Sequence, residues 1–238
     1  VIQERENSRI VVEAPPGAGK TAVIAARINS LIESGIVPSN IWLISFTRVA
    51  VREMKDRVTG WSSSFPAGLK VATLDQTAFR MNVALGVDVE ELIGDYTISI
   101  EKFAKKIKER DPDFMDFIDG MEHLIIDEAQ DFVDAREELC LQLIDSLPNE
   151  CGVSVLGDAH QAIYGWNTSN AGNLQLTLQD NELGRNFKSV ELQKIHRTSS
   201  PALLGLIEDL RLDLAVYDSA TEENWDRRID MIGGALPS

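Results

Sequence analysis

The feature that most constrains the fold of this chain is a glycine-rich loop, GAGKT, at residues 17–21. It lies between an apolar run at residues 9–13, which is typical of a buried strand, and a helical pattern at residues 22–28. Glycines let successive backbone N–H groups turn around an anion. The helix that follows adds its free N–H groups and the positive end of its dipole. The order strand, loop and helix therefore predicts a phosphate-binding loop.

The loop fits the pattern G-x-x-x-x-G-K-[ST] with one departure, because Ala14 stands at the first glycine. An ordinary glycine-rich turn before a helix is the alternative, and the strand-loop-helix context favours a nucleotide site. Lys20 would reach the β- and γ-phosphates, and the Thr21 hydroxyl would ligate Mg²⁺. ATP and Mg²⁺ are thus the expected cofactors. The predicted nucleotide contacts in the loop are Pro16, Gly17, Ala18, Gly19, Lys20 and Thr21.

Apolar runs alternate with helical patterns along the chain, which predicts a parallel α/β sheet flanked by helices. Residues 88–120 differ, since they are charged, helical in pattern and broken by Asp-Pro-Asp, and we expect a small helical insertion there. After the loop, strands are expected at residues 41–46, 69–73, 121–128, 153–158 and, with a weaker pattern, 190–192.

A second motif, LIIDEAQD at residues 124–131, supplies the acids that a phosphate loop needs. The apolar strand would carry Asp127 to the carboxyl edge of the sheet, where ligands bind in such folds. Asp127 would hold Mg²⁺, and Glu128 would orient and deprotonate the attacking water. A solvated turn or a helix cap is the alternative for this acidic pair. The presence of the phosphate loop favours the catalytic interpretation.

Composition limits the partners. The chain has 238 residues and a formal net charge of −15, which gives no overall electrostatic footprint for nucleic acid, so any such surface must be local. No apolar run approaches membrane-spanning length, and we expect no membrane partner. Cys140 and Cys151 match no metal or redox spacing. A buried free thiol is expected at Cys140, and the setting is expected to be cytoplasmic.

The DEAQD stretch resembles motif II of the UvrD/Rep family of superfamily 1 DNA helicases. Further stretches resemble motifs of that family in the same order, from about residue 11 to residue 198. They are motif Ia at 44–54, a short motif at 71–75, motif III at 156–166 and motif IV at 192–198. The resemblance implies a RecA-like P-loop NTPase domain, the first of two motor domains with ATP between them.

The resemblance also implies roles for single residues. Gln161 would sense the γ-phosphate and link it to bound DNA. Arg197 would contact the γ-phosphate, since a guanidinium fork matches phosphate oxygens. His196 stands where an aromatic that stacks on adenine is expected. Six residues would contact single-stranded DNA through base stacking or the backbone: Phe46, Thr47, Arg48, Thr73, Tyr164 and Trp166.

Some of these positions have a simpler interpretation. Phe46 ends an apolar strand and is also a candidate core residue, and Arg48 is equally a solvated residue at a helix start. Three departures from the family pattern weaken contacts to phosphate or nucleotide. Asp75 replaces a histidine and would repel a phosphate backbone, while Asn167 and Ala22 each replace an arginine.

Nothing after residue 198 resembles the later motifs of the family. We therefore expect an ATP-binding domain at residues 1–198 and, at 199–238, a segment leading toward a second RecA-like domain that this sequence lacks. The expected function is an ATP-driven translocase or helicase on single-stranded DNA, weakly active or inactive as an isolated chain. Two alternatives are a nucleotide-gated switch or scaffold without unwinding activity, and a small-molecule kinase. The kinase does not explain residues 46–54 and 161–166.

Overall fold

The computed structural model has an open sheet of parallel strands covered by helices on both faces. It describes residues 1–62, 64–94, 96–158, 161, 174–180, 185–196, 200 and 203–205. Within these residues the sheet has six strands in the order β3-β2-β4-β5-β1-β6, and every neighbouring pair is parallel. The strands are β1 (Arg9–Glu13), β2 (Ile41–Ser45), β3 (Lys70–Thr73), β4 (His123–Ile126), β5 (Gly152–Gly157) and β6 (Lys188–Glu191). The predicted parallel α/β fold is confirmed.

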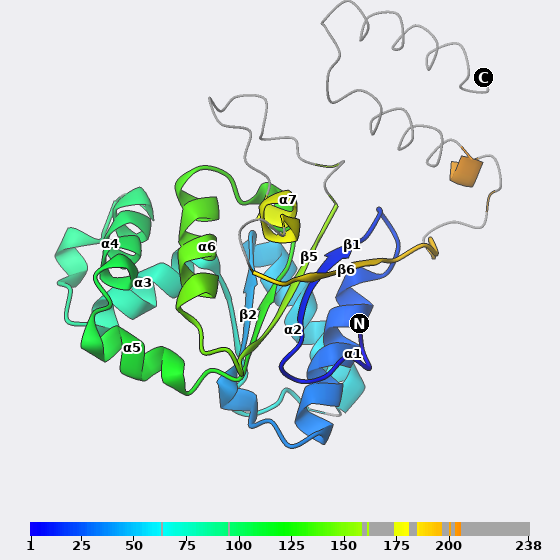
Figure 1. Ribbon diagram of the computed structural model, residues 1–238, viewed down its shortest axis with the longest axis horizontal. Helices are drawn as coiled ribbons and strands as arrows, with labels where there is room; N and C mark the ends of the chain where they lie inside the picture. The colour runs from blue at the N-terminus through cyan, green and yellow to red at the C-terminus, as the bar shows by residue number, and fades with distance from the viewer. Residues whose placement is uncertain are drawn as a thin grey trace, which may run out of the picture. The chain divides into compact units, whose positions relative to one another are not determined.

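The two faces of the sheet are covered by different helices (Figure 1). Successive side chains of a strand point to opposite faces of the sheet, so each face has its own core. In β1, Val11 packs in the core of one face, while Ile10 and Val12 pack in the core of the other. One face carries α1 (Lys20–Glu33) and α2 (Arg48–Ser62). The other carries α3 (Leu74–Ala84), α4 (Tyr96–Lys108), α5 (Pro112–Asp119), α6 (Ala135–Ser146) and α7 (Leu174–Gln179). Short 3₁₀ turns are η1 (Pro38–Asn40), η2 (Val89–Glu91) and η3 (Ala129–Asp131).

Residues 88–120 contain η2, α4 and α5, in keeping with their helical pattern. Helix α4 packs against α3 and α6, and Phe103 meets Phe114 of α5 edge-on with ring centroids 5.5 Å apart. This region therefore extends the helical layer on one face of the sheet. Val1–Arg197 forms one compact unit. The division of the chain into domains at residue 198 stays a prediction.

Both cysteines are buried free thiols, as expected for Cys140, and burial raises the pKa of each. None of the helices in the described ranges is both long and apolar enough to cross a membrane.

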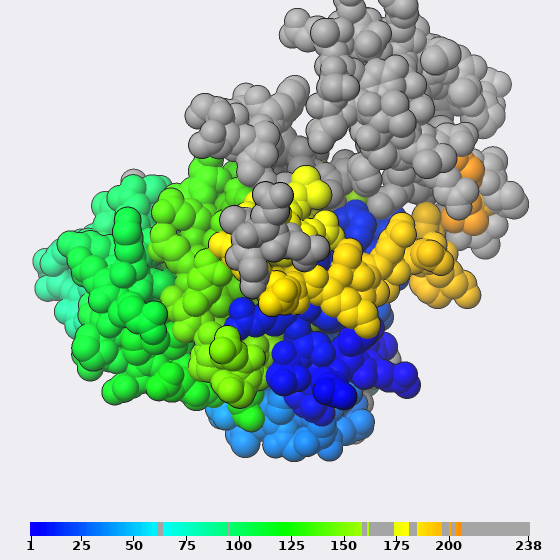
Figure 2. Space-filling model, viewed as in Figure 1, coloured from blue at the N-terminus to red at the C-terminus, as the bar shows by residue number. Residues whose placement is uncertain are grey.

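A buried arginine ties the residues before β1 to the domain. Arg27 of α1 is only 2% exposed, and its guanidinium donates to the backbone carbonyls of Ile2, Glu4 and Arg5. Lys188 at the start of β6 forms an ion pair with Glu4 from the other side. In Figure 2 this N-terminal segment (dark blue) lies at the surface beside the β6 region (yellow). Three carbonyls thus accept hydrogen bonds from the two terminal nitrogens of the guanidinium, which would be costly to bury alone.

His123, at the start of β4, is a second buried anchor. It is fully buried, with Nδ1 2.8 Å from the carbonyl oxygen of Glu6 and Nε2 2.9 Å from the hydroxyl of Ser154. Burial, together with the nearby charge of Arg27, lowers the pKa of His123 to about 4. The imidazole is therefore neutral at neutral pH, and its protonation opposes folding.

We predict that His123 makes the domain sensitive to acid. Its folded pKa of about 4 lies below the usual value of about 6.5, so the unfolded chain binds the extra proton first. Stability is therefore lost as the pH falls through this window. By linkage, the unfolding free energy of the wild type should fall by about 2 kcal/mol relative to His123→Asn between about pH 7.5 and about pH 5. Urea titrations of both proteins measure this, and a difference independent of pH would contradict it.

Candidate nucleotide and nucleic-acid site

The phosphate loop follows β1 and is held in place by its neighbours in the sheet. The backbone N–H of Ala14 donates to the carbonyl of Gly157, at the end of β5, over 2.8 Å. Gly17 and Gly19 have φ angles of 79° and 87°, a region that side chains other than glycine rarely adopt. Helix α1 begins at Lys20 without a side-chain cap, so its first N–H groups face the loop. These features fit an anion-binding loop.

The segment after β6 runs beside this loop. The N–H of Leu192 donates to the carbonyl of Glu13 over 2.9 Å, and the N–H of His196 donates to the carbonyl of Gly17 over 2.8 Å. A cleft of about 620 Å³ opens at this point, a size that suits a nucleotide. It is lined by residues 15–23 of the loop and α1, together with Glu53, Arg57, Glu128, Gln161 and His196.

An ion pair joins the two predicted halves of the nucleotide site. The Lys20 ammonium lies 2.6 Å from Glu128 Oε2, although 108 residues separate them in sequence. The side chains are 13% and 32% exposed, so solvent reaches both. Glu128 itself has a left-handed backbone (φ 54°), which turns the chain sharply after β4. The loop lysine and the acid after β4 are thus in direct contact.

Asp127, the residue before this glutamate, is 4% exposed, and its Oδ1 has no hydrogen-bond partner in the described part of the chain. Burial, followed by the charge of Glu128, raises the pKa of Asp127 to about 7. The same two causes raise the pKa of Asp131 to about 6. A buried carboxylate oxygen without a hydrogen bond is suited to a cation, and Mg²⁺ prefers oxygen ligands such as this one and the hydroxyl of Thr21. These residues therefore fit a magnesium ion.

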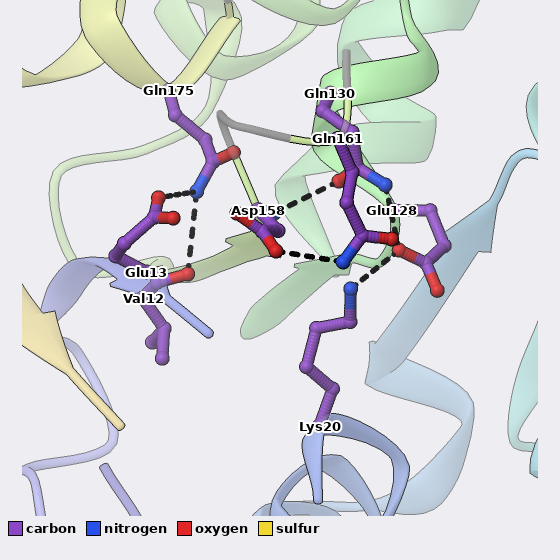
Figure 3. Close-up of polar contacts among 8 residues, drawn as sticks. All are labelled: Val12, Glu13, Lys20, Glu128, Gln130, Asp158, Gln161 and Gln175. Atoms are coloured by element: carbon purple, nitrogen blue, oxygen red, sulfur yellow. Dashed lines mark hydrogen bonds and ion pairs between the residues drawn. The ribbon is translucent and has the colours of Figure 1, made fainter. Parts of the chain in front are cut away.

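Side chains link Glu128 to Gln161 through a chain of hydrogen bonds (Figure 3). Gln130 donates to Glu128 Oε2 over 2.9 Å and accepts from the backbone N–H of Asp158 over 3.0 Å. The Asp158 carboxylate then accepts from Gln161 over 2.6 Å. The ends of β4 and β5 are thereby connected by buried groups behind the cleft.

The predicted DNA-contacting residues of β2 and α2 differ in exposure. Phe46 is half-buried, packs at the rim of the core and meets Phe132 edge-on at 5.7 Å, so part of its ring serves the core. Thr47 and Arg48 are exposed. The Thr47 hydroxyl caps α2 by accepting from the N–H of Ala50 over 3.1 Å. Arg48 donates to the Tyr96 hydroxyl over 3.0 Å.

Thr73 is 4% exposed and caps α3 in a reciprocal pair with Gln76, so its hydroxyl has a structural task. Asp75 is ion-paired with Arg136, with the closest atoms 2.8 Å apart, and this pairing compensates the charge that we expected to repel phosphate. A cavity of about 250 Å³ at the ends of β2 and β3 brings several of these residues together. Its lining is Phe46, Arg48, Thr73, Asp75, Gln76 and Tyr96.

Three predicted site residues, Tyr164, Trp166 and Arg197, lie outside the described residues, as does Asn167. Their predicted roles stay predictions.

Comparisons with known proteins identify the family. Residues 1–167 match a protein family described as an AAA domain, which is well over half of the chain. The chain belongs to this family.

Relatives of this chain include proteins named as helicases. It is 23% identical over 195 residues to a putative ATP-dependent DNA helicase of Acanthamoeba polyphaga mimivirus, covering 80% of this chain and 28% of the relative. It is 26% identical over 129 residues to a DNA helicase II homologue of Rickettsia conorii, covering 51% of this chain and 19% of the relative. The AAA domain thus spans less than a third of the length of these relatives.

The fold is similar to the crystal structure of Pif1 helicase from Candida albicans, with a TM-score of 0.53 and 17% sequence identity, covering 89% of this chain and 44% of that one. The predicted RecA-like fold is confirmed by this likeness, and the family match and the names of the relatives agree with the predicted resemblance to helicases, a class that uses a nucleotide.

Sequence reasoning gave no role to two buried glutamines of this chain, Gln130 and Gln175. Gln130 lies inside the DEAQD motif and bridges Glu128 and Asp158, as described above. Gln175 of α7 donates to the Val12 carbonyl and the Glu13 carboxylate, both over 3.3 Å (Figure 3). The role of Gln130 could have been predicted, because it lies between Glu128 and Asp131 directly after a strand. The role of Gln175 could not, because its partners are more than 160 residues away in the sequence.

We predict that Gln130 stabilises the domain. Gln130→Leu would leave the buried N–H of Asp158 without an acceptor, which should cost about 1–3 kcal/mol of unfolding free energy. Gln142→Leu is a matched control, because the side chain of Gln142 donates to Glu138 in the preceding turn of α6 at an exposed position, and its loss should cost less than about 0.5 kcal/mol. Urea denaturation measures both. Equal losses of unfolding free energy in the two variants would show that the buried hydrogen bonds of Gln130 do not stabilise the domain.

Proposed function

We propose that this AAA domain is the ATP-binding half of an ATP-dependent translocase or helicase that acts on single-stranded DNA. The observation that carries the proposal is the 2.6 Å contact between Lys20 and Glu128 in the cleft. It joins a phosphate-binding cation to a carboxylate that can take a proton from water. The names of the two relatives, one an ATP-dependent DNA helicase and the other a DNA helicase II homologue, support it.

In this mechanism Lys20 exchanges Glu128 for the β- and γ-phosphate oxygens of ATP when the nucleotide enters. The released Glu128 carboxylate then orients a water molecule and accepts its proton. Gln130 keeps that carboxylate in place through its hydrogen bond. Thr21 and Asp127 would hold Mg²⁺, which neutralises charge on the phosphates when bound. The free Oδ1 of Asp127 supports this assignment.

Residues at the rim of the cleft would report the nucleotide to the rest of the motor. Gln161 lines the cleft and is bonded to Asp158, so a change at the γ-phosphate would be transmitted to the end of β5. His196 also lines the cleft and would stack on adenine. Arg197, the next residue, would contact the γ-phosphate. The remaining loop residues, Pro16, Gly17, Ala18 and Gly19, would cradle the phosphates.

Single-stranded DNA would bind locally, because a chain of net charge −15 offers no general attraction for it. The exposed Thr47 and Arg48 would contact the backbone, and Phe46 would offer the free part of its ring to a base. Thr73, Tyr164 and Trp166 would complete this surface. The other wall of the nucleotide cleft would come from a second RecA-like domain in the full-length protein, which we place in the cytoplasm.

ATP hydrolysis by the purified chain, measured with and without a single-stranded oligonucleotide, tests the proposal. We expect weak Mg-ATP binding, slow hydrolysis stimulated by DNA, and no unwinding. Glu128→Gln should reduce hydrolysis about a hundredfold or more while nucleotide binding persists, because only the base is lost. Lys20→Ala should abolish binding as well. A longer protein that carries the second domain should be faster in the same assay.

Two outcomes would contradict the proposal. Nucleotide binding without hydrolysis, even in the longer protein, would indicate the nucleotide-gated switch instead. Hydrolysis that Glu128→Gln leaves unchanged would show that another group is the base.

A further inference from the structure

A second cavity lies at the β3 edge of the sheet, away from the nucleotide cleft. Its volume is about 390 Å³, and it opens between β2, β3, α2, α3 and α5. Three strands separate β3 from β1, so the cavity is about 19 Å from the phosphate loop at the usual strand spacing. Buried Trp42, Val71 and Met81 contribute an apolar floor. Phe117, which is 37% exposed, adds an aromatic ring to the lining.

Three cations surround this apolar floor. Lys55, Lys70 and Arg80 line the cavity, all three are exposed, and no acidic residue is among its lining. None of the ion pairs formed by the described residues involves any of the three. In a chain of net charge −15, three neighbouring cations without an acidic partner are unusual. They create a local positive field over an apolar cavity.

Lys70 is held by two aromatic rings at this site. Its ammonium lies 4.5 Å from the ring centroid of Trp42 and 4.9 Å from that of Phe117. The two rings meet edge-on at 5.1 Å. Burial lowers the pKa of Lys70, so the ammonium is partly desolvated and would gain from an anionic partner. The cation is therefore positioned by packing and is available to a ligand.

We propose that this cavity binds a short acidic segment of a partner protein that inserts one apolar side chain between the cations. The apolar floor accepts the inserted side chain, and Lys55, Lys70 and Arg80 pair with flanking carboxylates. A nucleic acid fits less well, since Trp42 is only 6% exposed and offers no open ring face on which a base could stack. The inference does not depend on the ATPase activity proposed above.

A simpler role for Lys70 makes the opposite prediction. β3 is an edge strand, and lysine on an edge strand discourages unwanted pairing with other chains. If this were its only task, the cavity would bind no acidic peptide.

The test is fluorescence anisotropy with a labelled synthetic peptide of three aspartates and one phenylalanine, added to the full chain. We expect saturable binding that Lys70→Glu and Arg80→Glu each weaken about tenfold or more, because like charges then face the peptide. Lys108→Glu on α4 makes the same charge change outside the cavity and should alter affinity less than about twofold. Peptides with serines for the aspartates, or serine for the phenylalanine, should both lose binding.

Three results would overturn the proposal. One is the absence of saturable binding by the acidic peptide. Another is equal weakening by Lys70→Glu and Lys108→Glu, which would indicate general charge attraction. The third is displacement of the peptide by a single-stranded oligonucleotide whose own binding Lys70→Glu weakens equally, which would assign the cavity to nucleic acid. Circular dichroism of each variant checks folding. We expect all variants to fold, because the substituted cations are exposed.

Discussion

The structure depends on the parallel pairing of β1 between β5 and the edge strand β6, in a sheet that is covered on both faces. Parallel strands end at the same edge, so the loop after β1, the acids after β4 and the turn after β5 all meet there. The hydrogen bond from Ala14 to Gly157 fixes the loop against β5. The order of the strands therefore brings the parts of the site together, and the side chains at the strand ends supply its chemistry.

Polar groups buried behind the cleft convert this arrangement into a rigid one. Gln130 and Gln175 flank Gly157, where even a single added carbon would lie within 2.7 Å of both amide oxygens. Their hydrogen bonds connect the ends of β1, β4 and β5. A buried hydrogen-bond network of this kind favours a single arrangement, since each lost partner leaves a buried polar group unsatisfied. Lys20 and Glu128, in contrast, lie in solvent contact and are free to exchange partners.

Much of the fold and half of the site could be predicted from the sequence, because those signals are local. The loop at residues 17–21 and the pair Asp127 and Glu128 follow apolar strands directly, so short patterns identify them. The bond between Asp75 and Arg136 could not be predicted, since it joins residues 61 apart through tertiary packing. Phe46 shows the limit of such patterns: its ring packs on Phe132 and is also partly exposed, so both interpretations describe part of it.

The contacts of Arg27 have a consequence for where this domain can be cut. Helix α1 buries a guanidinium whose partners, the carbonyls of Ile2, Glu4 and Arg5, all precede the first strand. A protein trimmed to begin at β1 would keep the Arg27 guanidinium and lose every acceptor described for it. Leaving a buried charge without partners strongly lowers the free energy of unfolding. The irregular residues before β1 therefore belong to the folded domain, although they form no helix or strand and lie at its surface.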